Sequence, residues 1–392
     1  MRRPLFTLIE AVRLDRDLRL IMLSNFFWSS GFMLYSFLWP IYVRDLGGTA
    51  REIGLLSSLM FLTMTVTLIP GGALAERWNR KWLILITWII ATPAPLVYAL
   101  ARSWEHLAPG VVIYSFFLGW PAYEAYIAAA SAPGRLSRAY ALTSAGFSLG
   151  AILAPLIGAA LLPSIGIRRI FFLAFALFSA STATLFFLSP QQSPEPPRSG
   201  DGRGKLASLL RDRRLMTWLF VFALAALGTS AARPFIPPLL QDRFALARPA
   251  ILMMSALLSL GEVVLAVLLG WIADRWRRSR ALGLALASTS LGFILLFTGL
   301  GPYLVPLAMV SLGGDRVSLS LSRSIVGHRA RSGASGPAFT LYWVVLGIAQ
   351  TLGPSLGGTL YAGSALRPFY LGAGLTLLSA GILWKLGELR SD

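Results

Sequence analysis

The chain of 392 residues has no cysteine, two histidines and few charged side chains. Without cysteine it has no disulfide, no thiolate nucleophile and no cysteine-ligated metal site. His106 and His328 stand near predicted helix ends and do not cluster, so we expect no metal. The sequence also lacks a Gly-x-x-x-x-Gly-Lys phosphate loop, which argues against ATP as the energy source. We therefore expect neither a cofactor nor an enzyme.

Charged residues make up 13% of the chain, against about 25% in an ordinary soluble domain. Hydrophobic residues reach 56% and the mean hydropathy is +0.67, which indicates an integral protein of a lipid bilayer. The formal net charge of +18 would suit nucleic acid. However, no basic stripe with stacking aromatics occurs outside the apolar runs, and positive charge gathers in cytoplasmic loops of membrane proteins. We expect no nucleic-acid partner.

Apolar runs long enough to cross a bilayer predict twelve membrane-spanning helices and hence an all-α fold. Their approximate ranges are 20–43, 53–75, 82–101, 108–130, 140–162, 170–188, 215–240, 249–273, 281–300, 302–325, 338–361 and 368–384. The longest polar interruption, residues 189–213, is rich in proline and glycine and is expected to be a linker. It divides the chain into two six-helix bundles, residues 1–188 and 214–392.

Lysine and arginine are unevenly distributed over the loops. If the N-terminus is cytoplasmic, 24 of the 35 basic residues fall in cytoplasmic segments, eight in outer loops and three inside spans. Because basic loops are retained in the cytoplasm, we expect both termini and the linker to be cytoplasmic. The chain would then be a multi-pass protein of the cell membrane.

One short pattern occurs once in each half. Gly72-Ala-Leu-Ala-Glu-Arg-Trp-Asn-Arg-Lys81 is followed 198 residues later by Gly270-Trp-Ile-Ala-Asp-Arg-Trp-Arg-Arg-Ser279. That offset is close to half of the 392-residue chain, which indicates duplication of a whole domain. In a membrane protein, two like halves suggest a transporter whose substrate site lies between them.

The repeated pattern resembles the loop motif Gly-x-Leu-Ala-Asp-Arg-x-Gly-Arg-Lys of the major facilitator superfamily. This chain departs from it at Glu76, Asn79 and Arg277. The resemblance covers nearly the full length. It implies two pseudo-symmetric six-helix bundles that alternate access to a central cavity.

The same turns have a mechanical interpretation. Glu76 and Asp274 stand at helix ends beside arginines, where each can pair with a neighbouring helix and hold one conformation, while the glycines permit close approach. The alternative is a solvated turn that only sets topology. The predicted gating latch consists of Gly72, Glu76, Arg77, Arg80, Gly270, Asp274, Arg275 and Arg278.

A second pair of motifs supports the duplication. Gly150-Ala-Ile-Leu-Ala-Pro155-Leu-Ile-Gly-Ala159 and Ala349-Gln-Thr-Leu-Gly-Pro354-Ser-Leu-Gly-Gly358 have prolines 199 residues apart. Both resemble the Gly-x-x-x-Gly-Pro-x-x-Gly-Gly motif of the family's proton-coupled exporters. Small residues let helices approach closely, and Pro155 and Pro354 each remove a helix hydrogen bond and allow a bend. Ordinary small-residue packing is the alternative.

Ionisable side chains inside a span are costly and are therefore candidates for function. Five stand out in spans 4, 7, 8 and 10: Glu124, Arg233, Glu262, Asp315 and Arg316. The resemblance implies that these spans line the central cavity. Arg323 is set aside, because it lies near a span end and can reach the surface. Either Glu262 or Asp315 is expected to exchange a proton, and purely structural ion pairing is the alternative.

Aromatic and polar side chains form a stripe along the first span. Asn25, Trp28 and Tyr35 are its candidates for the substrate cavity, with Phe32 and Trp39 on the same face. The alternative is that the stripe packs against neighbouring helices.

Taken together, these features predict a secondary transporter. The leading prediction is a proton-coupled exporter of amphipathic, drug-like molecules, and we expect it to act as a monomer. One feature counts against that prediction, because Ser115 stands where proton-coupled members often have arginine. The first alternative is an organic-anion carrier that uses Arg233 and Arg316. The second is a membrane receptor or scaffold that does not transport.

Overall fold

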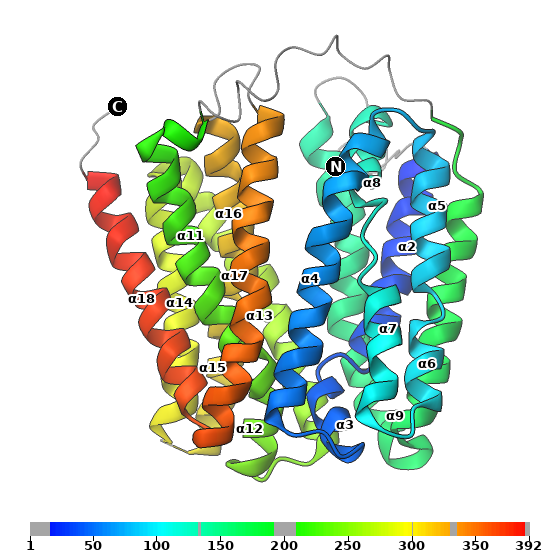
Figure 1. The fold of residues 1–392 in the computed structure, drawn as a ribbon, viewed down its shortest axis with the longest axis vertical. Coiled ribbons are helices and arrows are strands. Elements are labelled where there is room, and N and C mark those ends of the chain that lie inside the picture. The colour runs from blue at the N-terminus through cyan, green and yellow to red at the C-terminus, as the bar shows by residue number, and fades with distance from the viewer. Residues whose placement is uncertain (1–15, 132–134, 192–208, 300, 330–334, 389–392) are drawn as a thin grey trace, which may run out of the picture.

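The computed structural model describes residues 16–131, 135–191, 209–299, 301–329 and 335–388, and within them every regular element is a helix (Figure 1). The chain ends and residues 192–208 of the predicted linker lie outside the described residues. The helices of the N-terminal half are α2 (Arg16–Met33), α3 (Trp39–Asp45), α4 (Ala50–Ala75), α5 (Arg80–Ala91), α6 (Ala94–Leu100), η1 (Trp104–His106), α7 (Leu107–Tyr114), α8 (Trp120–Ala129) and α9 (Leu136–Phe186).

The C-terminal half repeats the same plan. Its helices are α11 (Arg213–Ala232), η2 (Arg233–Phe235), α12 (Ile236–Asp242), α13 (Arg248–Arg275), α14 (Arg278–Thr298), η3 (Pro302–Leu304), α15 (Val305–Leu312), α16 (Gly314–Arg329), α17 (Ser335–Gly363) and α18 (Arg367–Glu388).

The described helices account for the twelve predicted spans. Nine helical stretches, some of them made of consecutive shorter helices, are long and apolar enough to cross a membrane. Two further spans are each divided into shorter helices, α2 with α3 and α7 with α8. The helix α9 contains two spans joined at Gly166, whose φ of 74° is one that glycine adopts without strain. The prediction of a twelve-span all-α membrane fold is confirmed.

The first, fourth, seventh and tenth spans are all broken near their middle. Pro40, Pro121 and Pro234 each stand in the first turn of the segment that follows a break. Proline is tolerated there because that turn needs no N–H donor, whereas it cannot continue the preceding helix. The tenth span breaks instead at Gly313, between α15 and α16.

The two halves stand side by side, with α2–α9 on the right and α11–α18 on the left of Figure 1. Two helix pairs connect the halves, because α4 packs against α17 and α13 packs against α9. The first and last described residues lie at the same end of the molecule, which we call the terminus end (Figure 1). The boundaries at residues 188 and 214 stay predictions.

The two proline motifs lie at close helix contacts. Gly150 faces the hydroxyls of Ser29 and Ser30 on α2, and Gly353 faces the hydroxyl of Ser230 on α11. Both helices continue through their prolines, and α9 departs from helical geometry at Gly166 instead. The structure therefore supports the packing interpretation of the motif, and a bend at Pro155 or Pro354 stays a prediction.

Candidate functional site

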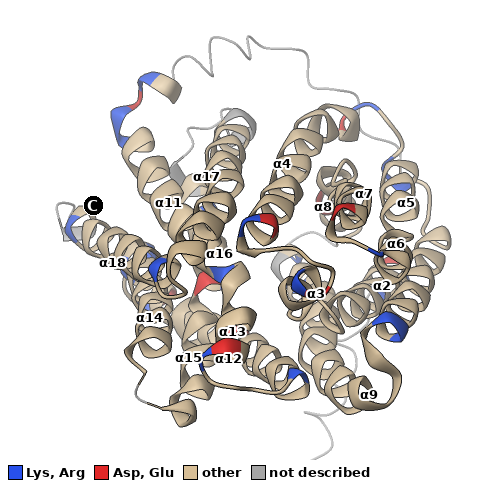
Figure 2. Cartoon of the chain, turned by 60° about the horizontal axis from the view of Figure 1, so that its bottom comes forward, with Lys and Arg blue, Asp and Glu red and all other residues tan. Residues whose placement is uncertain are grey.

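Four of the five predicted intramembrane charges meet at the breaks of the seventh and tenth spans. Arg233 is the first residue of η2, and Asp315 and Arg316 lie in the first turn of α16. Glu262 lies near the middle of the unbroken α13. Figure 2 shows acidic and basic segments of α16 near the centre of the helix arrangement. We call these residues the four-charge cluster.

The cluster is held together by Arg233. Its Nη1 donates to Oδ2 of Asp315 at 2.7 Å, and its Nη2 lies 3.4 Å from Oε1 of Glu262. Nε of Arg316 is 3.8 Å from the same glutamate oxygen. Two arginines therefore balance two carboxylates, which lowers the cost of placing charge at membrane depth.

Two glycines bring the carboxylates together. A side chain at Gly313 would collide with the backbone of Gly261 and Glu262, and one at Gly261 would collide with the backbone of Val310. The helices α13, α15 and α16 therefore meet backbone to backbone at the level of Glu262. Neither glycine was recognised from the sequence, since a single glycine in an apolar run gives no signal of its neighbour.

The basic side chains of the cluster are more exposed than the acidic ones. The side chains of Glu262 and Asp315 are 18% and 13% exposed, whereas those of Arg233 and Arg316 are 36% and 46% exposed. Arg316 also interacts electrostatically with Tyr114 on α7, in the other half. The guanidinium groups are therefore the members of the cluster accessible to a solute.

The fifth predicted charge, Glu124 on α8, lies apart from the cluster. Its Oε1 accepts a hydrogen bond from Nε1 of Trp120 at 3.1 Å and lies 4.0 Å from Nη1 of Arg323. Arg323 belongs to α16, so this weak pair joins the two halves. The guanidinium of Arg323 also lies 5.8 Å from the centre of the Trp343 ring. Arg323, set aside in the sequence, thus joins the candidate site.

The aromatic stripe of the first span is mostly internal to the N-terminal half. Tyr35 is 2% exposed and packs 4.9 Å from Phe171, so in this structure it faces the core of that half, as the packing alternative predicts. Trp28 stacks on Phe178 at 4.0 Å. Asn25 donates to the Thr143 carbonyl oxygen at 3.0 Å, which ties α2 to α9.

The predicted latch is not engaged. Glu76 and Asp274 are exposed, and no described residue forms an ion pair with either. Nothing approaches within 4 Å of a side chain built at Gly72 or Gly270, so the expected close approach there is absent in this structure. Arg80 donates instead to the Ala125 carbonyl and to Gln191, both at 3.4 Å.

Ion pairs join the halves at the opposite end. Arg44 contacts Asp242 at 2.9 Å, and Arg248 contacts Asp45 at 2.7 Å. Tyr361 adds a hydrogen bond to Asp242 at 3.3 Å. Arg44 and Asp242 are 198 residues apart, the offset of the loop repeat, so equivalent positions carry opposite charges. We call these four charges the outer gate.

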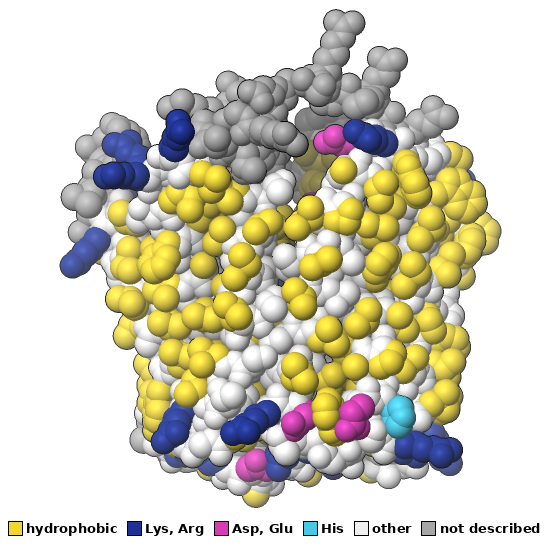
Figure 3. All heavy atoms as spheres, in the orientation of Figure 1, with side chains coloured by type: hydrophobic (Ala, Val, Ile, Leu, Met, Phe, Trp, Pro, Cys, Tyr) yellow, Lys and Arg dark blue, Asp and Glu magenta, His cyan; other side chains and the backbone are white. Residues whose placement is uncertain are grey.

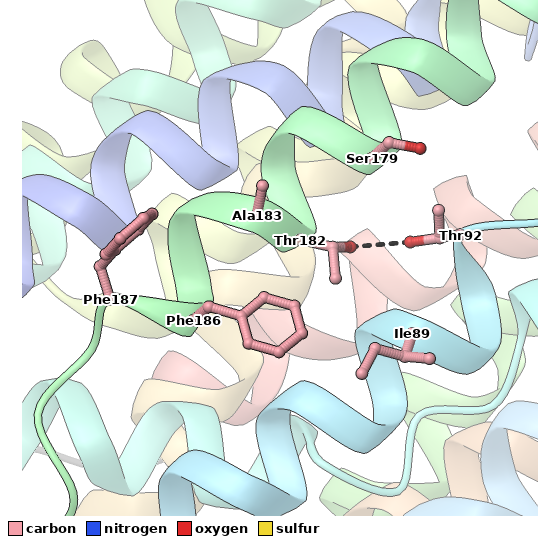
Figure 4. A pocket seen from close by; sticks show the side chains of 7 residues that line it. All are labelled: Ile89, Thr92, Ser179, Thr182, Ala183, Phe186 and Phe187. Atoms are coloured by element: carbon pink, nitrogen blue, oxygen red, sulfur yellow. Dashed lines mark hydrogen bonds between the residues drawn. The ribbon is translucent and has the colours of Figure 1, made fainter.

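Two shallow grooves lie away from the four-charge cluster. One, of about 460 Å³, lies between α5 and α9, where the hydroxyls of Thr92 and Thr182 bond at 2.7 Å (Figure 4). None of the predicted site residues lines it. Its lining is Ile89, Thr92, Ser179, Thr182, Ala183, Phe186 and Phe187.

Twelve spans in two like halves, with charges at broken helices, define a polytopic membrane transporter. The chain belongs to the Major Facilitator Superfamily, whose sequence model matches residues 21–231 and 218–391. The family prediction, like that of a non-enzymatic transporter, is confirmed.

Curated relatives match over almost the whole chain. The multidrug resistance protein MdtG of Enterobacter lignolyticus is 25% identical over 388 residues, covering 96% of this chain and 93% of that protein. MdtG of a Rahnella species is 24% identical over 385 residues, covering 95% and 93%.

Solved structures share the fold. A mutant of the nucleoside transporter NupG superimposes with a TM-score of 0.79 at 15% identity, covering 94% of this chain and 99% of that one. The human organic anion transporter MFSD10 gives 0.66 at 18% identity, covering 95% and 99%.

Proposed function

We propose that this protein exports amphipathic, drug-like molecules across the cell membrane in exchange for protons, with its termini in the cytoplasm. The relatives named as multidrug resistance proteins support the substrate class, since they match almost the full length. The observation that carries the coupling is the loose pairing of Glu124 with Arg323 between the two halves.

Glu124 is the favoured proton site because the other carboxylates are better neutralised. Asp315 and Glu262 both contact Arg233, at 2.7 Å and 3.4 Å. Glu124 has one distant cation and a side chain 42% exposed, so a proton can reach it. Its other titratable neighbours are Tyr123 and Tyr140. Protonation would remove its attraction to Arg323 and so weaken a contact between the halves.

The conformation fits one step of alternating access. With the termini cytoplasmic, the outer gate closes the far side, while Glu76 and Asp274 at the terminus end hold no described partner. Closing the terminus end would require new contacts there and loss of the ion pairs of the outer gate. Two halves that rock in this way open a central site first to one side of the membrane and then to the other.

Transport by the purified protein in proteoliposomes tests this function. We expect an inward proton gradient to drive export of lipophilic cationic or neutral compounds, and collapse of the gradient to stop it. Accumulation that is indifferent to the gradient would contradict proton coupling. Failure to move any amphipathic compound would contradict the substrate class.

An organic-anion carrier is the second candidate, favoured by the exposed guanidinium groups of Arg233 and Arg316. Under that function, Arg316→Gln abolishes transport of an aromatic carboxylate, and Glu124→Gln has little effect. Under the exporter function the effects are reversed, so the same two variants separate the candidates.

A further inference from the structure

The turn from α13 to α14 forms a basic patch with the end of α18. The guanidinium of Arg280 lies 5.6 Å from the centre of the Trp384 ring, and Gly283 adjoins the Ala380 carbonyl, so α14 and α18 are neighbours here. We define the basic patch as Arg275, Arg277, Arg278, Arg280 and Lys385. Figure 3 shows charged side chains at the two ends of the molecule and a hydrophobic band between them.

Three of these arginines lack an anionic partner. No described residue accepts a hydrogen bond or forms an ion pair with Arg275, Arg278 or Arg280, and Nε of Arg280 is buried without a partner. Asp274, the carboxylate within the same turn, is exposed and unpaired among the described residues. Among the described residues, the positive charge of Arg275, Arg278 and Arg280 is therefore uncompensated.

The equivalent turn in the first half is differently built. There the Asn79 side chain accepts from the Lys81 N–H at 3.1 Å and caps α5. In the second half Arg277 stands at the capping position and its side chain makes no cap, so no side-chain cap from that position satisfies the first N–H groups of α14. An anion would interact favourably with that helix end and with the arginines together.

Tryptophans place the patch at the level of lipid headgroups. Trp271 and Trp276 are 64% and 59% exposed, and tryptophan concentrates at the boundary between hydrocarbon and water. Val267 and Leu268, one turn earlier on α13, are 69% and 54% exposed and offer an apolar surface for acyl chains. The cations and the apolar surface thus follow one another in the same order as the charged headgroup and the apolar chains of a phospholipid.

We propose that the basic patch binds an anionic phospholipid, its headgroup phosphate on Arg278 and Arg280 and its chains along α13. Free phosphate shares the headgroup chemistry but cannot use the apolar surface. The site is separate from the four-charge cluster and does not depend on the transported substrate, although Arg275 and Arg278 also belong to the predicted latch.

Native mass spectrometry of the full-length protein in detergent, titrated with phosphatidylglycerol or with phosphatidylcholine of the same chains, tests the proposal. The wild type is expected to bind phosphatidylglycerol preferentially. Arg278→Gln with Arg280→Gln should weaken that binding about thirtyfold, from about 1 kcal/mol for each charge removed. The charge-conserving pair Arg278→Lys with Arg280→Lys should retain it, which excludes misfolding as the cause.

The matched control removes two charges from the equivalent turn, Arg77→Gln with Lys81→Gln, and should leave the binding unchanged. Equal loss in the control would show attraction to net charge alone and overturn the site. Absence of a preference for phosphatidylglycerol would overturn it as well. Displacement of the lipid by millimolar inorganic phosphate would show a free-anion site instead.

Discussion

At the scale of single residues, partner distance and exposure distinguish the intramembrane charges from one another. Arg233 holds Asp315 at 2.7 Å, a contact that neutralises both groups. Glu124 and Arg323 are 4.0 Å apart and are both more than a third exposed. A tight pair stabilises one arrangement, whereas a loose pair between moving halves is suited to change during transport.

Glu124→Gln is expected to reduce gradient-driven accumulation at least tenfold while sparing substrate exchange at equal pH, because exchange needs no proton. Flux assays in proteoliposomes measure both. The control is Glu105→Gln in the exposed η1 turn, where a hydrogen bond from Ser103 lowers the pKa of the carboxyl, so Glu105 carries no exchangeable proton at neutral pH. Gradient-driven transport that survives Glu124→Gln would refute its role as proton carrier.

Asp315→Asn is expected to destabilise the folded protein by about 3 kcal/mol, because it leaves Arg233 with the more distant Glu262. Adding Arg233→Gln should recover much of the loss, since the pair is then removed together. Thermal unfolding in detergent compares the two variants with the wild type. A double variant less stable than Asp315→Asn would contradict the pairing.

At the scale of elements, the broken spans position the charges. A helix that ends inside the membrane leaves backbone groups free and lets the chain change direction. Arg233, Asp315 and Arg316 all lie in the first turn after such a break, in η2 and α16. The unbroken α13 then completes the cluster through its close approach at Gly261 and Gly313.

Gly313→Ala is expected to force α13 and α16 apart, since the new methyl group would collide with the backbone at Gly261. The melting temperature should fall and substrate binding should weaken several-fold, because Glu262 moves relative to Asp315. The matched control is Gly374→Ala, where nothing lies within 4 Å. Equal effects of the two substitutions would contradict the contact at Gly313, since alanine by itself favours a helix over glycine.

At the scale of the whole molecule, the duplication places opposite charges face to face. Arg44-Asp45 and Asp242-Arg243 occupy equivalent positions at the 198-residue offset, with the order of charge reversed. A pseudo-twofold arrangement would repel like charges at these positions, whereas Arg44 attracts Asp242. Asp45 pairs with Arg248 rather than with its repeat equivalent Arg243.

Reversing one charge, Arg44→Asp or Asp242→Arg, is expected to shift the protein toward the state open at the outer end. Single cysteines placed near the gate in this cysteine-free chain should then react several-fold faster with a thiol reagent. The double reversal restores attraction and should restore slow labelling. Double and single reversals that label equally fast would contradict the gate.

Topology is checked in intact cells with a membrane-impermeant thiol reagent. Ser103→Cys, directly before η1 at the far end, should be labelled, and Ser189→Cys, the first residue of the predicted linker, should be protected. The reason is the excess of basic residues at the terminus end. The opposite pattern would invert the proposed orientation.

The sequence by itself determined the class, the span number and the duplication, because hydropathy and a fixed offset are local or periodic signals. It also found all four members of the charge cluster, since a charge inside an apolar run stands out without knowledge of its neighbours. It predicted the latch motif but not whether the latch is engaged in this conformation.

Only the tertiary structure decided which charges are partners. Arg233 meets Asp315 across 82 residues, and Glu124 meets Arg323 across the division between the halves. It also placed Tyr35 inside its own half and joined Arg44 to Asp242. Such contacts depend on how helices that are distant in sequence are oriented and cross in the fold. The helical period shows on which face of its helix a residue lies, but not which other helix that face contacts.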